Sequence, residues 1–258
     1  MRLIDTHSHL DFPEFDADRE HVLGNAAAGG VERVVVLGVT ADNLQRVWQL
    51  ACSDPRVYAA LGLHPVFLAQ HRPEHLLELR NWFERLRGDP RLCAVGEIGL
   101  DYYLAELDPA EQQALFEAQL QIACDFNLPA LLHVRRSHAQ VIATLKRYRL
   151  QRAGIIHAFA GSFEEAREYI KLGFKLGLGG AATWPQALRL RKTVARLPLE
   201  SVVLETDAPD MAPAMYPGLR NSPEHLPQIT QVLAELMGVA PEQLAAASSR
   251  TACELFGW

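Results

Sequence analysis

Short apolar runs rich in β-branched residues alternate with longer amphipathic or helix-favouring segments along the whole chain. Apolar runs of this length, bounded by turn residues, are typical of buried strands. The predicted strands are Leu3–His7, Arg33–Val39, Val57–Leu63, Leu92–Glu97, Ala130–His133, Gly154–His157, Phe174–Leu178 and Val202–Glu205. The predicted helices are Asp18–Ala28, Ala41–Ser53, Glu74–Arg87, Pro109–Phe126, His138–Tyr148, Ser162–Leu172, Pro185–Leu197, Leu226–Met237 and Pro241–Phe256.

The order of these elements predicts an α/β fold. Eight strands, each followed by a helix, within about 250 residues are typical of a TIM (β/α)₈ barrel. A doubly wound open sheet is the alternative. Because no linker, Pro-rich tract or low-complexity block divides the chain, we expect residues 1–258 to form a single domain.

The composition narrows the class of protein. A chain of 258 residues with 49% hydrophobic content can bury a substantial core. The net charge of −6 argues against broad electrostatic coating by nucleic acid. The four cysteines are widely spaced and form no CxxC, so we expect buried thiols in a reducing compartment. Without a signal sequence or membrane-length apolar stretch, the expected location is cytoplasmic.

Histidines and carboxylates stand at the ends of the predicted strands. His7 and His9 end the first strand, and residues i and i+2 of a strand point the same way, so the two imidazoles form a chelating pair. In a barrel, the carboxyl ends of all strands meet at one face, which carries the active site. The other residues at such positions are His64, Glu97, His133, His157 and Asp207.

This donor set predicts a metal centre. Mixed imidazole and carboxylate ligands suit Zn²⁺ or Mn²⁺, whereas a pure oxygen cage would have indicated Mg²⁺ or Ca²⁺. Mg²⁺ stays open as a third possible ion. Six ligands exceed one zinc site, so we expect two divalent ions and a hydrolytic reaction, with Glu97 bridging and Asp207 accepting the proton of the attacking water. The first ion is assigned to His7, His9, Glu97 and Asp207, and the second to Glu97, His133 and His157.

A second group of residues is predicted to contact substrate from loops at the same face. Arg135 is placed to hold a phosphate, and the aromatic rings of Tyr102 and Tyr103 to stack on a base. The remaining candidates are His64 and Asp101. His64 precedes a proline, so a rigid loop start is the alternative role for this residue.

Several motifs resemble one known family. They are Asp5-Thr6-His7-Ser8-His9, Gly62-Leu63-His64-Pro65, Gly96-Glu97-Ile98-Gly99-Leu100-Asp101-Tyr102, Leu132-His133-Val134-Arg135, His157-Ala158-Phe159-Ala160-Gly161-Ser162 and Glu205-Thr206-Asp207-Ala208-Pro209. In this order they resemble the TatD family of metal-dependent deoxyribonucleases, within the amidohydrolase superfamily. Arg136, where many members have an acidic residue, resembles the YjjV-like subgroup.

The resemblance implies a TIM barrel, a divalent-metal site and hydrolysis of phosphodiester bonds in DNA. The ligands it implies are the six already named: His7, His9, Glu97, His133, His157 and Asp207. We therefore expect a DNA substrate, taken from an end or as a single strand, with no membrane and no obligate protein partner. Two alternatives stay open: a small-molecule amidohydrolase or esterase with the same metal pair, and a metal-binding scaffold that has lost catalysis.

Overall fold

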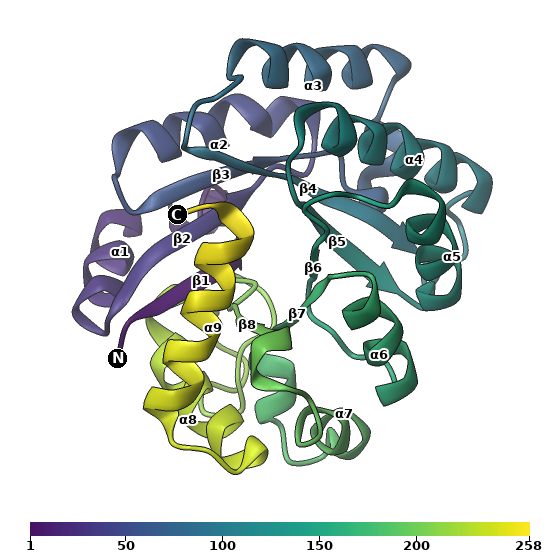
Figure 1. Ribbon diagram of the computed structural model, residues 1–258. Coiled ribbons are helices and arrows are strands. Elements are labelled where there is room, and N and C mark those ends of the chain that lie inside the picture. Colours follow the sequence, from purple (N-terminus) through teal and green to yellow (C-terminus); the bar gives the residue numbers. More distant parts are fainter.

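The computed structural model describes residues 1–258 and contains an eight-stranded parallel sheet whose strands are neighbours in sequence order (Figure 1). The strands are β1 (Leu3–Ser8), β2 (Val31–Leu37), β3 (Val57–Leu61), β4 (Leu92–Asp101), β5 (Ala130–Arg135), β6 (Gly154–Ile156), β7 (Lys175–Leu178) and β8 (Val202–Leu204). The α-helices are α1 (Arg19–Ala28), α2 (Ala41–Ser53), α3 (Pro73–Arg85), α4 (Pro109–Phe126), α5 (His138–Tyr148), α6 (Phe163–Lys171), α7 (Leu188–Val194), α8 (Leu226–Met237) and α9 (Pro241–Phe256).

The sheet closes into a nearly complete barrel with the helices outside it (Figure 1). Between β8 and β1 the ladder is reduced to one parallel bridge, which joins Ser8 and Ala208. A doubly wound sheet would reverse its strand order at a switch point, and this sheet does not. The structure therefore confirms the TIM barrel and excludes the open sheet.

The barrel interior is a packed core. One apolar cluster joins residues of seven strands to the end of α9, and residues spread around a barrel in this way meet only in its interior. Leu255 and Phe256 of α9 belong to this cluster. The larger cluster lies between the strands and the surrounding helices. Because both faces of each strand are buried, the strands read as continuous apolar runs.

Three sequence expectations need correction. β4 continues to Asp101, four residues beyond the predicted end at Glu97, because its pairing with β5 extends to Asp101 and Arg135. Both residues are therefore strand residues and not loop residues. The predicted helix Pro185–Leu197 is shorter, spanning Leu188–Val194. Cys52 is exposed on α2 and not buried.

The segment after β8 is anchored to the rest of the molecule. Arg220 forms an ion pair with Asp18, and the buried amide of Asn221 donates to the carbonyl of Thr206 at 2.7 Å. These contacts tie the segment to the residue that precedes α1 and to the chain just after β8. None of the helices is long and apolar enough to cross a lipid bilayer.

Candidate functional site

Glu97 lies at the centre of a cluster of imidazoles at the carboxyl ends of the strands. Its Oε2 atom is 3.1 Å from Nε2 of His7 and 3.4 Å from Nε2 of His9. Its Oε1 atom is 3.0 Å from Nε2 of His64 and 3.1 Å from Nδ1 of His133. The two oxygens of one carboxylate therefore face two separate pairs of histidines.

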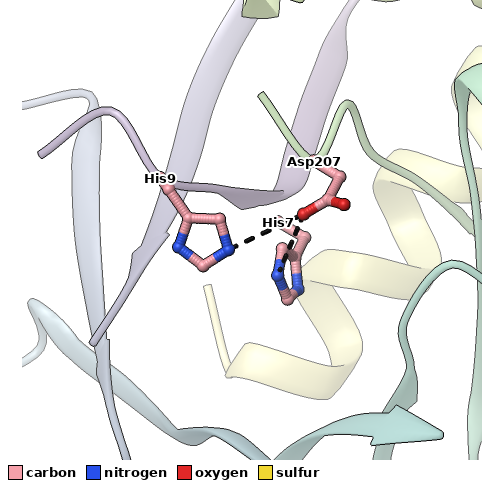
Figure 2. Close-up of side chains that lie close together, drawn as sticks. All are labelled: His7, His9 and Asp207. Atoms are coloured by element: carbon pink, nitrogen blue, oxygen red, sulfur yellow. Dashed lines mark ion pairs between the residues drawn. The ribbon is translucent and has the colours of Figure 1, made fainter. Parts of the chain in front are cut away.

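Asp207 completes the cluster from the opposite end of the chain. Its Oδ1 atom is 3.6 Å from Nε2 of both His7 and His9, as Figure 2 shows, and its Oδ2 atom is 3.8 Å from Nε2 of His157. The backbone N–H of Asp207 donates to the carbonyl of His7 at 2.9 Å. This bond holds the carboxylate against the chelating pair on β1.

The spacing of these atoms fits a metal ion. Ligand atoms that each bind one tetrahedral ion at 2.0–2.2 Å lie about 3.4 Å from one another. The distances of 3.1–3.6 Å among His7, His9, Glu97 and Asp207 match that value. A second set, His64, Glu97 and His133, also has its ligand atoms within 4.8 Å of one another. The donors present can therefore hold divalent metal.

His64 lies closer to this centre than the sequence suggests. Its side chain is buried, with Nε2 facing Glu97 and Nδ1 accepting from the backbone N–H of Val66 at 3.1 Å. The residue also caps the 3₁₀-helix η2 (Pro65–Gln70), which the sequence analysis did not predict. Because Nδ1 of the neutral ring accepts that bond, its proton is on Nε2, which donates to Glu97. His64 thus starts a rigid turn and holds the central carboxylate, and it is not counted among the proposed ligands.

Two buried carboxylates orient the histidines from behind. Oε1 of Glu205 is 3.0 Å from Nδ1 of His157 and accepts from the N–H of Ala158 at 2.6 Å. Oδ2 of Asp101 is 2.9 Å from Nε2 of His133. Such carboxylates fix the tautomer and the ring plane of a metal-binding imidazole. The sequence analysis assigned no such role to Glu205, although an acidic residue at a strand end was a usable signal.

Asp101 needs a further correction. It was expected to contact substrate from a loop, but its side chain is fully buried. Its second oxygen accepts from the backbone N–H of Tyr103 at 2.9 Å. Asp101 therefore supports His133 and the turn after β4, and it does not face the cavity.

Burial and charge set the protonation of the cluster. Burial lowers the pKa of His7 and of His64 to about 4, which leaves both rings neutral, and the neutral ring of His7 can bind a cation. Burial also opposes charge on His157, but Asp207, Glu205 and Glu97 outweigh it and raise the pKa of His157 to about 10. Without a metal, a proton on this ring balances the carboxylates, so metal binding releases protons.

A cavity of about 510 Å³ opens above the cluster. Arg135, with 51% of its side chain exposed, is the one lysine or arginine in the lining. Tyr102 and Tyr103 do not line the cavity, and the guanidinium of Arg135 lies 3.8 Å from the ring centroid of Tyr103. The lining residues are His9, Phe12, Val39, His64, Val66, Phe67, Glu97, His133, Val134, Arg135, His157, Ala158, Ala160, Asp207, Asp210 and Met211.

Comparison with known proteins gives a consistent picture. The family model described as TatD related DNase matches residues 4–257. The uncharacterized metal-dependent hydrolase YjjV of Escherichia coli is 41% identical over 255 residues, which cover 99% of this chain and 98% of that protein. The crystal structure of YjjV superposes with a TM-score of 0.96, covering 100% of this chain and 98% of that chain.

A second relative carries a more specific name. The Citrobacter rodentium protein named 3'-5' ssDNA/RNA exonuclease TatD is 31% identical over 261 residues, covering 99% of this chain and 98% of that protein. The family match and the 41% identity to YjjV each extend over nearly the whole chain. This chain therefore belongs to the TatD family and is a metal-dependent hydrolase.

Proposed function

We propose that this hydrolase cleaves phosphodiester bonds in DNA, from an end or in single strands, with two divalent metal ions. The observation that carries the proposal is the position of Glu97. One of its oxygens faces His7 and His9, and the other faces His133 at 3.1 Å and His157 at 3.8 Å, as expected of a carboxylate that would be shared by two ions. The proposed ligands are His7, His9, Glu97, His133, His157 and Asp207.

The roles of the chain's own residues follow from their exposure. Bound by these donors, two ions such as Zn²⁺, Mn²⁺ or Mg²⁺ supply an activated water and neutralise phosphate charge. Asp207 has 13% of its side chain exposed, against 3% for Glu97, so it is the carboxylate that an attacking water can reach. We assign it the proton of that water. Arg135, on the rim, binds a phosphate oxygen.

The comparisons support this reaction class. The C. rodentium relative is named an exonuclease of single-stranded DNA and RNA, and the matching family model is described as TatD related DNase. The complete set of donors argues against a scaffold that has lost catalysis. Phosphodiester hydrolysis also suits a paired metal centre, which stabilises both the attacking and the leaving oxygen.

One observation favours a second candidate. Half of the sixteen residues that line the cavity are hydrophobic, and only Arg135 is a lysine or arginine. A mouth of this kind also suits a small amide, lactone or ester. A small-molecule amidohydrolase or esterase with the same metal pair is therefore the alternative.

A substrate panel separates the candidates. End-labelled single-stranded and duplex DNA, RNA, amides, lactones and carboxylate esters are incubated with protein loaded with Zn²⁺, Mn²⁺ or Mg²⁺. Cleavage of DNA that is lost in Glu97→Ala and Asp207→Asn supports the proposal. The matched controls are Glu242→Ala and Asp42→Asn, which change exposed residues of α9 and α2. Turnover of amides, lactones or esters alone overturns the proposal of a deoxyribonuclease. No turnover of any substrate indicates a metal-binding scaffold that has lost catalysis.

A further inference from the structure

Two phenyl rings in the cavity lie beside histidines of the cluster. The ring of Phe12, just after β1, stacks on His9 with centroids 4.9 Å apart and planes inclined by 21°. The ring of Phe67, in η2, meets His64 at 6.0 Å and 66°. Both side chains are half-buried and line the cavity. Neither was singled out by the sequence analysis.

These rings lie in an apolar arc on one side of the mouth. Phe12, Val39, Val66 and Phe67 come from the connections after β1, β2 and β3, which are neighbouring strands. Arg135 comes from β5, and in a barrel of eight strands in sequence order β5 lies across from β1. Both phenyl rings of the lining therefore lie on the side of β1–β3, and its single cation lies on the side of β5, beside Val134.

The charges at the mouth limit how much nucleic-acid backbone can bind there. Arg135 can neutralise one phosphate in addition to the one at the metal centre. Asp210, which also lines the cavity, repels phosphate on the side of β8. A long strand or a duplex would need a basic track, which this lining does not provide.

The tyrosines are poorly placed to bind a base. Tyr103 lies outside the cavity lining, and the guanidinium of Arg135 lies over its ring. Tyr102 packs against the apolar core. Phe12 and Phe67 are the aromatic side chains in the lining other than its histidines.

We propose that Phe12 and Phe67 hold the nucleobase of the terminal nucleotide of an unpaired strand, while Arg135 binds the neighbouring phosphate across the metal centre. This inference rests on the proposed function and specifies its substrate. A base in a duplex is stacked and paired, so its faces are not available to the phenyl rings. Stacking accepts every base because every base has a π-face, so the subsite selects an unpaired end and not a sequence.

The test compares short single-stranded oligonucleotides that end in a normal or an abasic nucleotide. Stacking contributes roughly 1–3 kcal/mol per base, so Phe12→Ala and Phe67→Ala should each raise KM roughly 5- to 150-fold on the normal end. Neither substitution should change KM for the oligonucleotide that ends in an abasic nucleotide. Phe163→Ala, which alters a partly buried ring of α6 outside the cavity, is the matched control and should change neither. Metal affinity from calorimetry should be the same in all these proteins.

The assignment of Arg135 has its own readout. Each phosphate neutralised on a single strand contributes a slope of about 0.7 to the dependence of log affinity on log salt. Arg135→Gln should therefore lower the slope by about 0.7. An unchanged slope would overturn the role of Arg135 in binding a phosphate.

Binding separates failure of this inference from failure of the proposed function. Fluorescence anisotropy with the Asp207→Asn protein measures the affinity for both oligonucleotides without depending on cleavage. Suppose that wild type cleaves DNA, but that the phenylalanine variants weaken binding of both oligonucleotides equally, or of neither. The base subsite is then wrong and the proposed function stands. If wild type cleaves no nucleic acid, the function is wrong, and equal binding of normal and abasic ends overturns the subsite as well.

Discussion

Oδ2 of Asp5 accepts a hydrogen bond from the hydroxyl of Thr206 at 2.6 Å, which joins two residues 201 positions apart. Oδ1 of Asp5 also accepts from the backbone N–H groups of Thr206 and His7, at 3.0 and 3.3 Å. These bonds close the barrel at the seam where the regular ladder is missing. His7 is one of the bonded residues, and Asp207 directly follows Thr206, which is another. The seam therefore also sets the distance between these two donors of the site.

Thr206→Val should weaken this seam. Burial raises the pKa of Asp5 to about 7, so above that pH the substitution leaves a buried, charged carboxylate oxygen without its hydrogen-bond partner, which costs about 1.5–3 kcal/mol. Urea unfolding measures the loss. Thr230→Val is the matched control, because its buried hydroxyl donates to a neutral carbonyl in α8, that of Leu226 at 2.7 Å. Equal losses in the two variants would show that Asp5 has no special role.

Asp101→Asn should reduce metal affinity. The buried carboxylate holds Nε2 of His133, and loss of such a partner typically lowers affinity 10- to 100-fold. Calorimetric titration with Zn²⁺ or Mn²⁺ measures the change. The control is Asp108→Asn, since Asp108 caps α4 on the surface and asparagine caps equally well. An affinity equal to that of wild type would contradict the positioning role.

Two identical glycine substitutions should have opposite effects on stability. A Cβ on Gly177 would overlap with Oε2 of Glu205, displacing the carboxylate that orients His157. Gly177→Ala should therefore lower both stability and metal affinity. Gly24, within α1, has open space around its Cα, so Gly24→Ala should stabilise the protein by about 0.5–1 kcal/mol. Thermal and urea unfolding distinguish the two, and a stabilised Gly177→Ala protein would contradict the packing described.

Acid should reduce stability through His138. Burial lowers the pKa of His138, and Nδ1 of its ring lies within hydrogen-bond distance of the hydroxyl of Tyr169, at 3.0 Å. The nearby carboxylate of Glu165 opposes the shift without cancelling it. Below the unfolded value of about 6.5 the unfolded chain takes up the proton more readily, so this contribution is complete above that pH and declines as pH falls.

The measurement compares wild type with His138→Asn by urea unfolding at several pH values between 8 and 5.5. The difference in unfolding free energy between the two proteins should shrink toward acid pH. The difference cancels the contributions of the other histidines. A gap that stays constant, or widens, would show that His138 does not couple folding to protonation.

The strands and the donor cluster were predictable for a simple physical reason. Parallel barrel strands are buried on both faces, so they appear as apolar runs, and a polar residue at the end of such a run stands out. His7, Glu97 and Asp207 are examples, and the structure brings them together with the other predicted donors. Their role as metal ligands stays a prediction that the titrations above test.

The end of β4 was predicted four residues too early, at Glu97. A glycine inside a strand carries no apolar side chain, so Gly99 interrupts the run of apolar residues that marks a buried strand. In the structure it has φ 145°, and a Cβ there would overlap with the carbonyl oxygen of His133. The glycine thus permits a close approach of β4 to β5, and Asp101 continues the strand.

Contacts between residues far apart in the sequence were the other feature that could not be predicted. Glu205 meets His157 from 48 positions away, and no local pattern reports such a pairing. Phe12 lies in a bend after β1 and Phe67 in the short 3₁₀-helix η2, and neither segment is long enough for a hydrophobic period to mark which way the ring faces. Their position in the cavity depends on how neighbouring connections fold together.

The proposed catalytic donors stand mostly on strands or at their tips, whereas Phe12, Phe67 and Met211 stand on the connections that follow them. Replacing such a connection leaves the hydrogen bonds of the barrel floor intact. The scaffold is therefore suited to loop grafting, in which new rims are screened for other phosphoesters while the hydrolytic machinery is retained.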